Sequence, residues 1–589
     1  MIVFRDQQVR ADPALLLSAL RCEVERFCWG TAAAHDAAVD LLISLGILEA
    51  GLDDAIFRES DGIAAISDQL RNASSAMGHV LWHTWGGQAG AAKPWMEQVA
   101  RSLEHVQRQS LPPMVQIGVP EGYAYYGVYP EMYLEAARQC QQVLGPGNAV
   151  CLGLRGIGTS LSGAVAGALE ELGCRVASYT LRPRGHPFAR RPVLTPQLAA
   201  AFRDARDSFF LIVDEGPGIS GSSLGGTAEL LGELGVEDER ILLLPSWRAD
   251  GSILRSWVAR SRWTRHRQFV AGFEEVWLDS GRLANSLPAG RLRDVSAGAW
   301  RRELYQDPRS FPPVQPQHER RKYLLETGAA VGSGREYRLL AFVGLGKRGP
   351  PRLHRMEQLA EAGFTPPPET IVHGFLVRQF VSGVPLHAED QADPALLNTM
   401  AAYLAHISRQ FPAEPSVTET TLREMVATNI REGLGEEWLD RADARLFETR
   451  AEWCERPAAL DGRMLPHEWL RTSRGFMKID ATDHHDDHFF PGCQDIAWDL
   501  AATCLEFNLD CAARTRLLRR YQELSDDRTI AARLPSHAVS YLAYRLGYAT
   551  LACSTLGEDG DGKRFAAAAE RYARLLRLEL SPEAESWYA

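Results

Sequence analysis

Apolar residues recur every three or four positions through the first part of the chain, from residue 13 to residue 111. Leu16, Leu20 and Val24 illustrate this spacing, which places apolar side chains on one face of an α-helix. Two consecutive prolines at positions 112 and 113 then interrupt the pattern, because proline cannot continue a helix. The pattern predicts a helical N-terminal region over residues 1–111.

Between residues 114 and 277, short β-type runs alternate with helical segments. The runs MVQIGV, NAVCLGL and FFLIVDE are strand-like, whereas SGAVAGALEELG and SLGGTAELLGELG are helical. Such alternation is typical of parallel βαβ units. We therefore predict a parallel-sheet domain over residues 112–290, with ligands bound beyond the carboxyl ends of its strands.

The stretch DPRSFPPVQPQHE separates this domain from the rest of the chain. Its four prolines are typical of a semi-rigid linker, and we predict a linker over residues 291–317. Strand-like runs follow as far as Leu386, and mostly helical sequence continues to Ala589. The predicted fold class is multidomain α/β: a helical N-terminal region, a parallel-sheet domain and a C-terminal α+β domain over residues 318–589.

The chain of 589 residues is 45% hydrophobic and 24% charged, values that are ordinary for a globular protein. A net charge of -11 argues against general nucleic-acid binding and against binding to anionic lipids. The ten cysteines include no C-x-x-C pair, the N-terminus lacks signal-peptide features, and no apolar stretch reaches the ~18 residues that span a bilayer. We expect a cytoplasmic protein that contacts no membrane; its oligomeric state is left open.

The strongest chemical motif is FFLIVDEGPGISGSSL, residues 209–224. An apolar strand ends in Asp214 and Glu215, and a turn rich in glycine and serine then leads into a helix. Backbone N–H groups at a helix N-terminus suit a phosphate, and paired carboxylates suit vicinal ribose hydroxyls or the second shell of Mg²⁺. The residues of the turn are Gly218, Ser220, Gly221, Ser222 and Ser223.

This motif resembles the signature of the type I phosphoribosyltransferases, in which two acidic residues precede a Thr-Gly-Gly-Thr-like turn. The resemblance implies that Ser220–Ser223 bind the 5-phosphate of phosphoribosyl pyrophosphate and that Asp214 and Glu215 contact the ribose hydroxyls. The spacer Gly216–Ile219 is one residue longer than the common three, and serine replaces threonine at both hydroxyl positions.

Two further segments follow the order of the same family. The run Arg155-Gly156-Ile157-Gly158-Thr159-Ser160 resembles a pyrophosphate-binding loop, although alone it would be an ordinary βα loop. The segment LRPRGHPFARRP is predicted to be a mobile loop that closes over pyrophosphate, although it could be a solvated surface. The resemblance, over residues 115–250, implies Mg²⁺ as cofactor and a catalytic role for Arg184 beside Asp214 and Glu215. Arg182 and His186 complete the predicted substrate-binding set.

Five tyrosines lie within eleven residues of the segment Pro120–Ala137. An aromatic, partly polar loop could stack on a planar acceptor, and Glu121 and Tyr123 are the candidate acceptor contacts. The alternative is that Tyr125, Tyr126 and Tyr129 pack between domains.

In the C-terminal part, GFLVRQFVSGVPL, residues 374–386, resembles the hinge strand of aminoglycoside phosphotransferase-like and choline-kinase-like proteins. Upstream lies a glycine-rich turn between two strand-like runs, followed by a helix that carries Glu357. By the resemblance, Glu357 and Lys347 are the candidate ion pair of a site for ATP or another nucleotide.

The catalytic region departs from that family. In LPHEWLRTSRGFMKID, Trp469 stands at the expected catalytic aspartate and Arg474 at the expected asparagine, while His467 and Asp480 are retained. Asp480 is the candidate metal ligand, but the substitutions favour a pseudokinase. The following loop, Asp483–His488, has the residue types of a metal site, yet ligands at consecutive positions rarely converge on one ion.

Together these features predict a phosphoribosyltransferase that transfers 5-phosphoribosyl from phosphoribosyl pyrophosphate to a planar small-molecule acceptor and releases pyrophosphate. Two alternatives stay open. In the first, a regulatory or scaffold protein senses nucleotides through non-catalytic phosphoribosyltransferase-like and pseudokinase domains. In the second, the chain is bifunctional and its kinase-like domain phosphorylates a small molecule.

Overall fold

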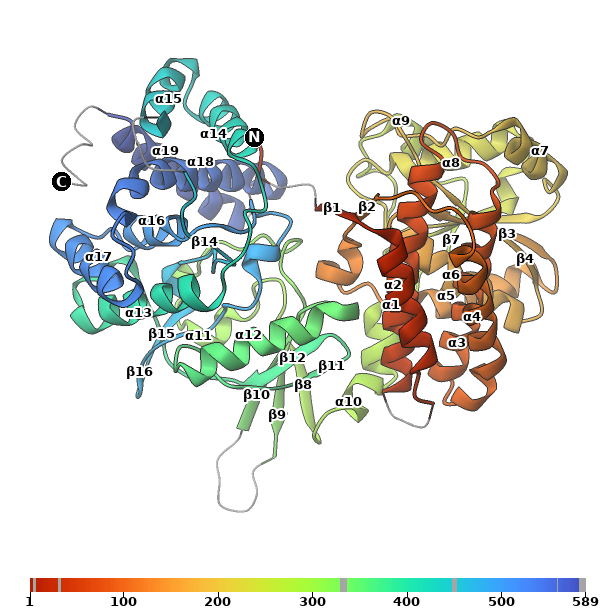
Figure 1. The fold of residues 1–589 in the computed structure, drawn as a ribbon, viewed down its shortest axis with the longest axis horizontal. Coiled ribbons are helices and arrows are strands. Elements are labelled where there is room, and N and C mark those ends of the chain that lie inside the picture. Colours follow the sequence, from red (N-terminus) through yellow and green to blue (C-terminus); the bar gives the residue numbers. More distant parts are fainter. Residues whose placement is uncertain (4–6, 30–32, 329–335, 448–452, 559, 582–589) are drawn as a thin grey trace.

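The computed structural model describes residues 1–3, 7–29, 33–328, 336–447, 453–558 and 560–581 (Figure 1). The N-terminal helices and a parallel sheet form one body, and the C-terminal half forms a second body beside it. Among the described residues, no helix combines the length and the apolar character needed to cross a membrane.

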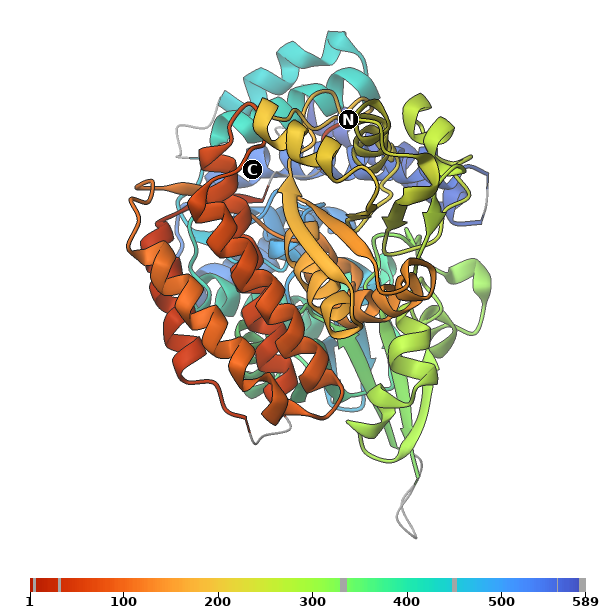
Figure 2. The same cartoon turned by 90° about the vertical axis from the view of Figure 1, so that its right-hand side faces the viewer.

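The N-terminal helices pack directly on the parallel-sheet body and share its hydrophobic core. Figure 2 shows these red and orange helices lying together along one side of the parallel strands. A Cβ added at Gly78 of α3 would lie 2.1 Å from the carbonyl oxygen of Gly163 in α6, so the two helix backbones nearly touch. The elements are β1 (Gln8–Ala11), α1 (Pro13–Glu25), α2 (Ala34–Ile56), α3 (Ala65–Trp85) and α4 (Lys93–Gln107).

The central sheet has five parallel strands in the order β4-β3-β5-β6-β7. The chain moves from β3 to β4 on one side and then returns to place β5 on the other side of β3, which creates a topological switch point between β3 and β5. The strands are β3 (Asn148–Leu154), β4 (Arg175–Leu181), β5 (Phe209–Val213), β6 (Ile241–Leu244) and β7 (Arg267–Gln268).

Helices cover both faces of this sheet, because its strands are apolar on both sides. The helices α2, α3, α5 and α6 cover one face, and α7, α8 and α9 cover the other. The remaining elements are β2 (Val115–Gly118), which pairs with β1, the π-helix η2 (Gly122–Tyr126), α5 (Pro130–Leu144), α6 (Ile157–Glu171), α7 (Pro196–Asp204), α8 (Ser222–Glu233), α9 (Trp257–Trp263), the π-helix η4 (Glu274–Asp279) and α10 (Arg282–Asn285).

The C-terminal body begins with a five-stranded antiparallel sheet in the order β11-β12-β10-β9-β8. The predicted linker, residues 291–317, is not a free spacer, because β8 pairs with β9 along the sheet edge and α11 follows it. The elements are β8 (Gly290–Asp294), α11 (Arg301–Leu304), β9 (Lys322–Thr327), β10 (Glu336–Phe342), α12 (Gly349–Glu361), β11 (Pro368–Val372) and β12 (Phe375–Gln379). The glycine-rich turn expected between β9 and β10 lies outside the described residues.

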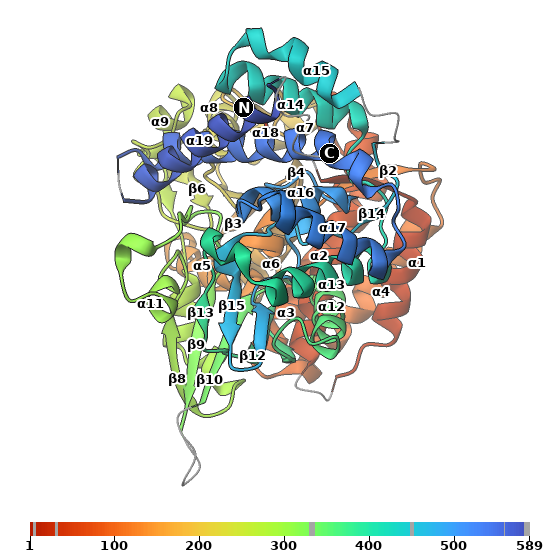
Figure 3. The same cartoon turned by 90° about the vertical axis from the view of Figure 1, so that its left-hand side faces the viewer.

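Short β-pairs and a helical lobe follow this sheet along the chain, and Figure 3 shows the helices above the sheet. The strand order of the small sheet is β13-β15-β16, and β14 pairs with β17. The elements are β13 (Val384–Pro385), α13 (Pro394–Gln410), α14 (Glu419–Gly433), α15 (Leu439–Phe447), β14 (Pro457–Ala458), the 3-10 helix η9 (Pro466–Glu468), β15 (Trp469–Thr472), β16 (Gly475–Lys478), β17 (Gln494–Asp495), α16 (Ala497–Glu506), α17 (Cys511–Ser525), α18 (Ile530–Leu556) and α19 (Gly560–Glu579).

The tyrosine-rich segment packs between the two bodies, as one of the two interpretations of the sequence expected. The Tyr129 hydroxyl donates to the carbonyl oxygen of His373 at 2.7 Å. A hydrogen bond of 2.7 Å joins the Tyr126 hydroxyl to Nε2 of His488, and the Tyr125 hydroxyl donates to the carbonyl of Asp486 at 2.5 Å. The tyrosines of this segment therefore reach the C-terminal body, and two of them bond to the loop that follows Asp480.

We expect Gly78→Ala to lower the free energy of unfolding by about 1–3 kcal/mol, because the added methyl group meets the backbone of α6. In a protein of this size each 1 kcal/mol lowers the melting temperature by roughly 2–4 °C, which calorimetry resolves. Gly90→Ala is the matched control, since a Cβ there meets nothing within 4 Å. Equal melting temperatures for the two variants would contradict the close packing of α3 on α6.

Candidate functional site

Three segments predicted to bind ligand meet at the switch point of the parallel sheet. A Cβ added at Gly158 would lie 2.5 Å from the carbonyl oxygen of Val213 and 3.5 Å from Oδ1 of Asp214. A Cβ added at Gly122 would lie 2.7 Å from Oε2 of Glu215. The loop after β3, the loop after β5 and the η2 helix therefore surround one point, because β3 and β5 are adjacent and end at the same edge.

Asp214 and Glu215 form an acidic centre at that point. Burial raises the pKa of Asp214 to about 6. Burial, together with repulsion from Asp214 and Glu121, raises the pKa of Glu215 to about 8. Neither carboxylate takes part in an ion pair within the described part of the chain, although Arg182 and Arg190 lower the pKa of Asp214 from a distance. Carboxylates that repel each other and have no paired cation suit Mg²⁺ or sugar hydroxyls.

The serine-rich turn after β5 adopts a compact conformation at the start of α8. Gly221 precedes the helix with φ of +65°, a left-handed conformation that glycine adopts without strain. The Ser222 amide donates to Oγ of Ser220 at 3.2 Å, and Oγ of Ser222 donates to the carbonyl oxygen of Pro187 at 2.7 Å. The turn is thus tied to the arginine-rich segment, while Gly218 is exposed and has nothing within 4 Å of an added Cβ.

The arginines predicted to hold pyrophosphate are bound instead to carboxylates of the N-terminal region. Asp61 contacts Arg155 and accepts from both terminal nitrogens of Arg184, each at 3.1 Å. Asp54 lies 2.9 Å from Nε of Arg155 and also pairs with Arg182. The Arg155 side chain has no exposed surface, so these cations hold the loops to the helices, a role that the sequence did not indicate.

The other residues predicted to contact substrate differ in their exposure to solvent. Tyr123 is buried, and a 2.8 Å hydrogen bond joins its hydroxyl to Oγ of Ser160, so it supports the loop after β3 from beneath. Oγ1 of Thr159 is buried and has no hydrogen-bond partner among the described residues. Glu121 and His186 are exposed, and Gly156 begins α6 with φ of +133°.

A second candidate site is a cavity of about 160 Å³ in the C-terminal body. It lies between the β8–β12 sheet and the segments around η9 and Asp480. Its lining combines aromatic rings with both signs of charge. The charged residues are Glu303, Glu319, Lys322, Arg378, Arg463, Glu468, Asp480 and Arg545.

A buried lysine lies among the carboxylates beside this cavity. Nζ of Lys478 is 2.6 Å from Oε2 of Glu468 and 3.2 Å from Oδ2 of Asp461. His484 lies 3.5 Å from Oδ1 of Asp480 and 3.6 Å from Oδ1 of Asp461. Burial would raise the pKa of Asp461, but Lys478 and His484 outweigh it and hold the pKa at about 2.

The histidine of this cluster carries a positive charge at neutral pH. Burial and Arg463 lower the pKa of His484, but Asp480, Glu468 and Asp461 outweigh them and raise it to about 9. Asp480 is likewise held ionised: burial opposes the charge, but His484 and Lys322 keep its pKa well below the ordinary value. Asp461, Glu468 and His484 offer atoms within 4.8 Å of one another, the spacing of a metal site.

The structure corrects the sequence alignment of the catalytic region. Trp469 is the first residue of β15 and is fully buried, and Arg474 lies in the exposed turn between β15 and β16. The loop that faces the cavity is therefore the one before Trp469, which carries Asp461 and Glu468. The sequence did contain a signal for this arrangement. The runs WLRT and GFMK on either side of a Ser-Arg turn predict a β-hairpin, which is the β15–β16 pair, and a strand cannot serve as the catalytic loop.

The predicted nucleotide-site ion pair is not formed. Lys347 pairs with Glu23 of α1, and Glu357 faces His354 on its own helix at 3.7 Å. The buried charged side chains of α12 are those of Arg352 and Arg355. Lys347 and Glu357 therefore lie outside the cavity just described.

The carboxylates of the polar loop Asp483–His488 form ion pairs with arginines from other elements. Arg352 contacts Asp483 at 2.9 Å and Asp486 at 3.0 Å. Arg320 also pairs with Asp483, and Arg348 lies 2.6 Å from Asp486. Because these arginines pair with Asp483 and Asp486, the two carboxylates do not converge on one metal ion.

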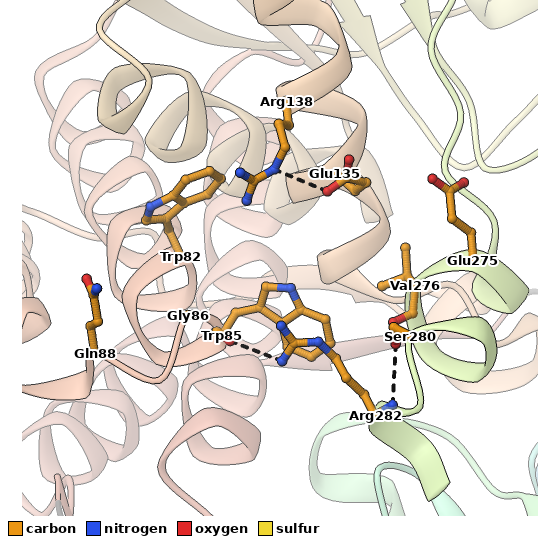
Figure 4. A pocket seen from close by; sticks show the side chains of 10 residues that line it. All are labelled: Trp82, Trp85, Gly86, Gln88, Glu135, Arg138, Glu275, Val276, Ser280 and Arg282. Carbon is orange, nitrogen blue, oxygen red and sulfur yellow. Dashed lines mark hydrogen bonds and ion pairs between the residues drawn. The ribbon is translucent and has the colours of Figure 1, made fainter. Parts of the chain in front are cut away.

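A second cavity, of about 450 Å³, lies between the end of α3, helix α5 and the η4 helix (Figure 4). Arg138 stacks 4.7 Å from the ring centre of Trp82, and Arg282 stacks 3.7 Å from that of Trp85. Each arginine is also held locally, Arg138 by Glu135 and Arg282 by the Trp85 carbonyl. None of the ligand-binding residues predicted from the sequence lines this cavity.

Comparisons with known proteins found similarity only among solved structures. No protein-family model and no curated protein matches the sequence. Choline kinase LicA from Streptococcus pneumoniae matches with 16% identity, a TM-score of 0.29 and coverage of 43% of this chain and 89% of its own. LicA in complex with AMP matches with 14% identity, a TM-score of 0.30 and coverage of 50% and 97%.

The macrolide 2'-phosphotransferase MphH from Brachybacterium faecium, in its apo form, matches with 17% identity, a TM-score of 0.31 and coverage of 52% and 97%. Each of these solved structures covers about half of this chain at less than 20% identity. The chain is a multidomain α/β protein that combines a parallel five-stranded sheet with an antiparallel five-stranded sheet and a helical lobe.

Proposed function

We propose that the parallel-sheet body binds phosphoribosyl pyrophosphate and transfers its 5-phosphoribosyl group to a small acceptor. The observation that carries the proposal is the acidic centre Asp214–Glu215, which has no ion-pair partner among the described residues and lies at the switch point, one short spacer before the serine turn. A binding site for a phosphorylated sugar needs both a hydroxyl acceptor and a phosphate-binding turn, and adjacent loops supply them here. The similarity to kinases gives no support to this transfer, so the proposal stands on the geometry alone.

In this mechanism the turn Ser220–Ser223 holds the 5-phosphate through backbone amides and hydroxyls. Asp214 and Glu215 accept hydrogen bonds from the ribose hydroxyls and stabilise positive charge as it develops on the ring. The acceptor nucleophile then attacks the anomeric carbon, and pyrophosphate leaves with the electron pair of the broken C–O bond.

The arginines take part only if they exchange partners. Arg182 and Arg184 are held by Asp54 and Asp61, and binding of a highly charged pyrophosphate would have to compete with those carboxylates. Such a competition couples ligand binding to the position of the N-terminal helices. Arg190 is exposed and is the nearest alternative cation.

Mg²⁺ fits this site, because Asp214 and Glu215 are neighbouring carboxylates without a paired cation. When bound, the metal would supply positive charge that offsets the charge of pyrophosphate. Asp214 and Glu215 would hold it, directly or through water.

A second candidate function belongs to the C-terminal body. Its cavity combines aromatic walls with Arg463 and Arg545, which suit a planar ring and a phosphate group. The two alternatives from the sequence, a nucleotide sensor and an active kinase, both require a nucleotide site in this body.

We expect the double variant Asp214→Asn, Glu215→Gln to weaken binding of phosphoribosyl pyrophosphate with Mg²⁺ by about 100-fold or more, because it removes two charge-assisted hydrogen bonds of ~1.5–3 kcal/mol each. Isothermal titration calorimetry measures the affinity. The matched control is Asp204→Asn, Asp207→Asn, which removes two exposed carboxylates near the start of β5. Equal affinity in both double variants, or no binding by the unmodified protein, would contradict the proposal.

Binding is also expected to depend on pH. The carboxylates must be ionised, and the pKa values of about 6 for Asp214 and about 8 for Glu215 place their ionisation between pH 6 and pH 8. Affinity for phosphoribosyl pyrophosphate with Mg²⁺ should therefore rise with pH, by up to about tenfold per pH unit for each proton released. In Glu215→Gln the rise above pH 7 should disappear, whereas an unchanged profile would exclude Glu215.

The same shift predicts the opposite trend for the stability of the free protein. A carboxyl group whose pKa is higher in the folded state stabilises the fold at low pH and loses that contribution as pH rises from 4.5 to about 8. The melting temperature of the free protein should fall over this interval relative to that of Glu215→Gln. Parallel curves for the two proteins would show that Glu215 does not titrate as proposed.

A further inference from the structure

The kinase-like cavity has carboxylates where a metal ion was expected, but a side chain of the same chain already lies between them. Asp480 was the predicted metal ligand, and Asp461 and Glu468 lie close to it. The Lys478 ammonium group contacts Glu468 and Asp461 and donates to the carbonyl oxygen of Asp480. It comes from the last residue of β16, two positions before Asp480.

The bonding capacity of this ammonium group is fully used. It donates to Glu468 at 2.6 Å, to the carbonyl oxygen of Arg463 at 3.1 Å and to the carbonyl oxygen of Asp480, and it pairs with Asp461 at 3.2 Å. An ammonium group has three N–H donors, so it has none left for a ligand. Its side chain has no exposed surface.

The charges of the cluster are also nearly balanced without a metal. Three carboxylates, those of Asp461, Glu468 and Asp480, face two fixed cations, Lys478 and His484. A divalent ion would have to displace Lys478 and would leave its ammonium group buried without partners, at a cost of several kcal/mol. Mg²⁺ also requires near-octahedral oxygen ligands at 2.0–2.1 Å, which the ammonium group now prevents.

The loop that bears Asp461 is rigidly supported, which prevents an easy rearrangement. The amides of Asp461 and Gly462 donate to the Asp499 carboxylate of α16 at 2.8 and 3.0 Å. Lys478 is anchored from the other side, because β16 pairs with β15 in register. Both partners of the ion pair are therefore held by backbone hydrogen bonds.

We infer that Lys478 is a permanent internal cation in place of the divalent metal, so that the cavity binds a nucleoside phosphate without metal and transfers no phosphoryl group. Phosphoryl transfer by kinases requires metal ions that bridge the phosphates. Here a phosphate would meet the cations that line the cavity, Lys322, Arg378, Arg463 and Arg545. This inference goes beyond the proposed phosphoribosyl transfer and does not depend on it.

The first test measures metal binding directly. The protein carrying Asp214→Asn and Glu215→Gln, which removes the other acidic centre, is titrated with Mn²⁺ while the EPR signal of the free ion is followed. We expect no binding below millimolar Mn²⁺. Binding that is tighter and is lost on adding Asp480→Asn would overturn the inference.

The second test asks whether removing the ammonium group opens a metal site. In the same background, Lys478→Met should gain Mn²⁺ binding and a Mn²⁺-dependent rise in melting temperature of at least about 2 °C. Lys322→Met is the matched control, because it removes a cation that lines the same cavity but pairs with Glu319 instead of lying between the carboxylates. Folded Lys478→Met protein that gains no metal binding would contradict the inference; if this variant does not fold, the first test still decides.

The third test uses ATP as the probe in the same Asp214→Asn, Glu215→Gln background. Its dissociation constant should differ by less than about twofold between EDTA and Mg²⁺, and no ADP should form. Arg545→Met should weaken binding at least tenfold. Mg²⁺-dependent affinity, ATP turnover abolished by Asp480→Asn, or the absence of ATP binding would each overturn the inference.

Discussion

Burying a charged side chain costs free energy unless an opposite charge accompanies it, and this protein meets that requirement with partners from distant parts of its chain. Asp61 of the N-terminal region holds Arg155 and Arg184 of the parallel-sheet body. In the C-terminal body, Lys478 is held between Asp461 and Glu468. These ion pairs join the segments that surround both candidate sites, so the shape of each site depends on them.

The pair Asp214–Glu215 differs from the carboxylates that are held in these ion pairs. It lies at the switch point of the sheet, its members repel each other, and burial raises both of their pKa values. Among the described residues neither carboxylate has an ion-pair partner, so both are left for a ligand. The contrast with the Asp461–Glu468–Lys478 cluster separates a site that requires an external cation from one that carries its own.

The two sites are physically connected through a short segment. Gly122 of the η2 helix lies against Glu215, and Tyr126 of the same helix bonds to His488. Eight residues separate His488 from Asp480 along the chain, and the ion pairs of Asp483 and Asp486 anchor that loop to Arg320, Arg348 and Arg352. Movement of the loop at one site therefore acts directly on the segment that borders the other.

Local pattern in the sequence was sufficient for the alternating strands and helices of the parallel sheet, including the strand, turn and helix over residues 209–224, because short-range periodicity and turn chemistry encode them. Only the tertiary structure decided the partners of the charges. Arg155 and Arg184 looked like anion ligands, and Asp53, Asp54 and Asp61 carried no motif, because ion pairs between residues about 100 positions apart leave no local signal. In the same way, Lys478 was an ordinary strand residue in the sequence, and its role depends on carboxylates that folding brings to it.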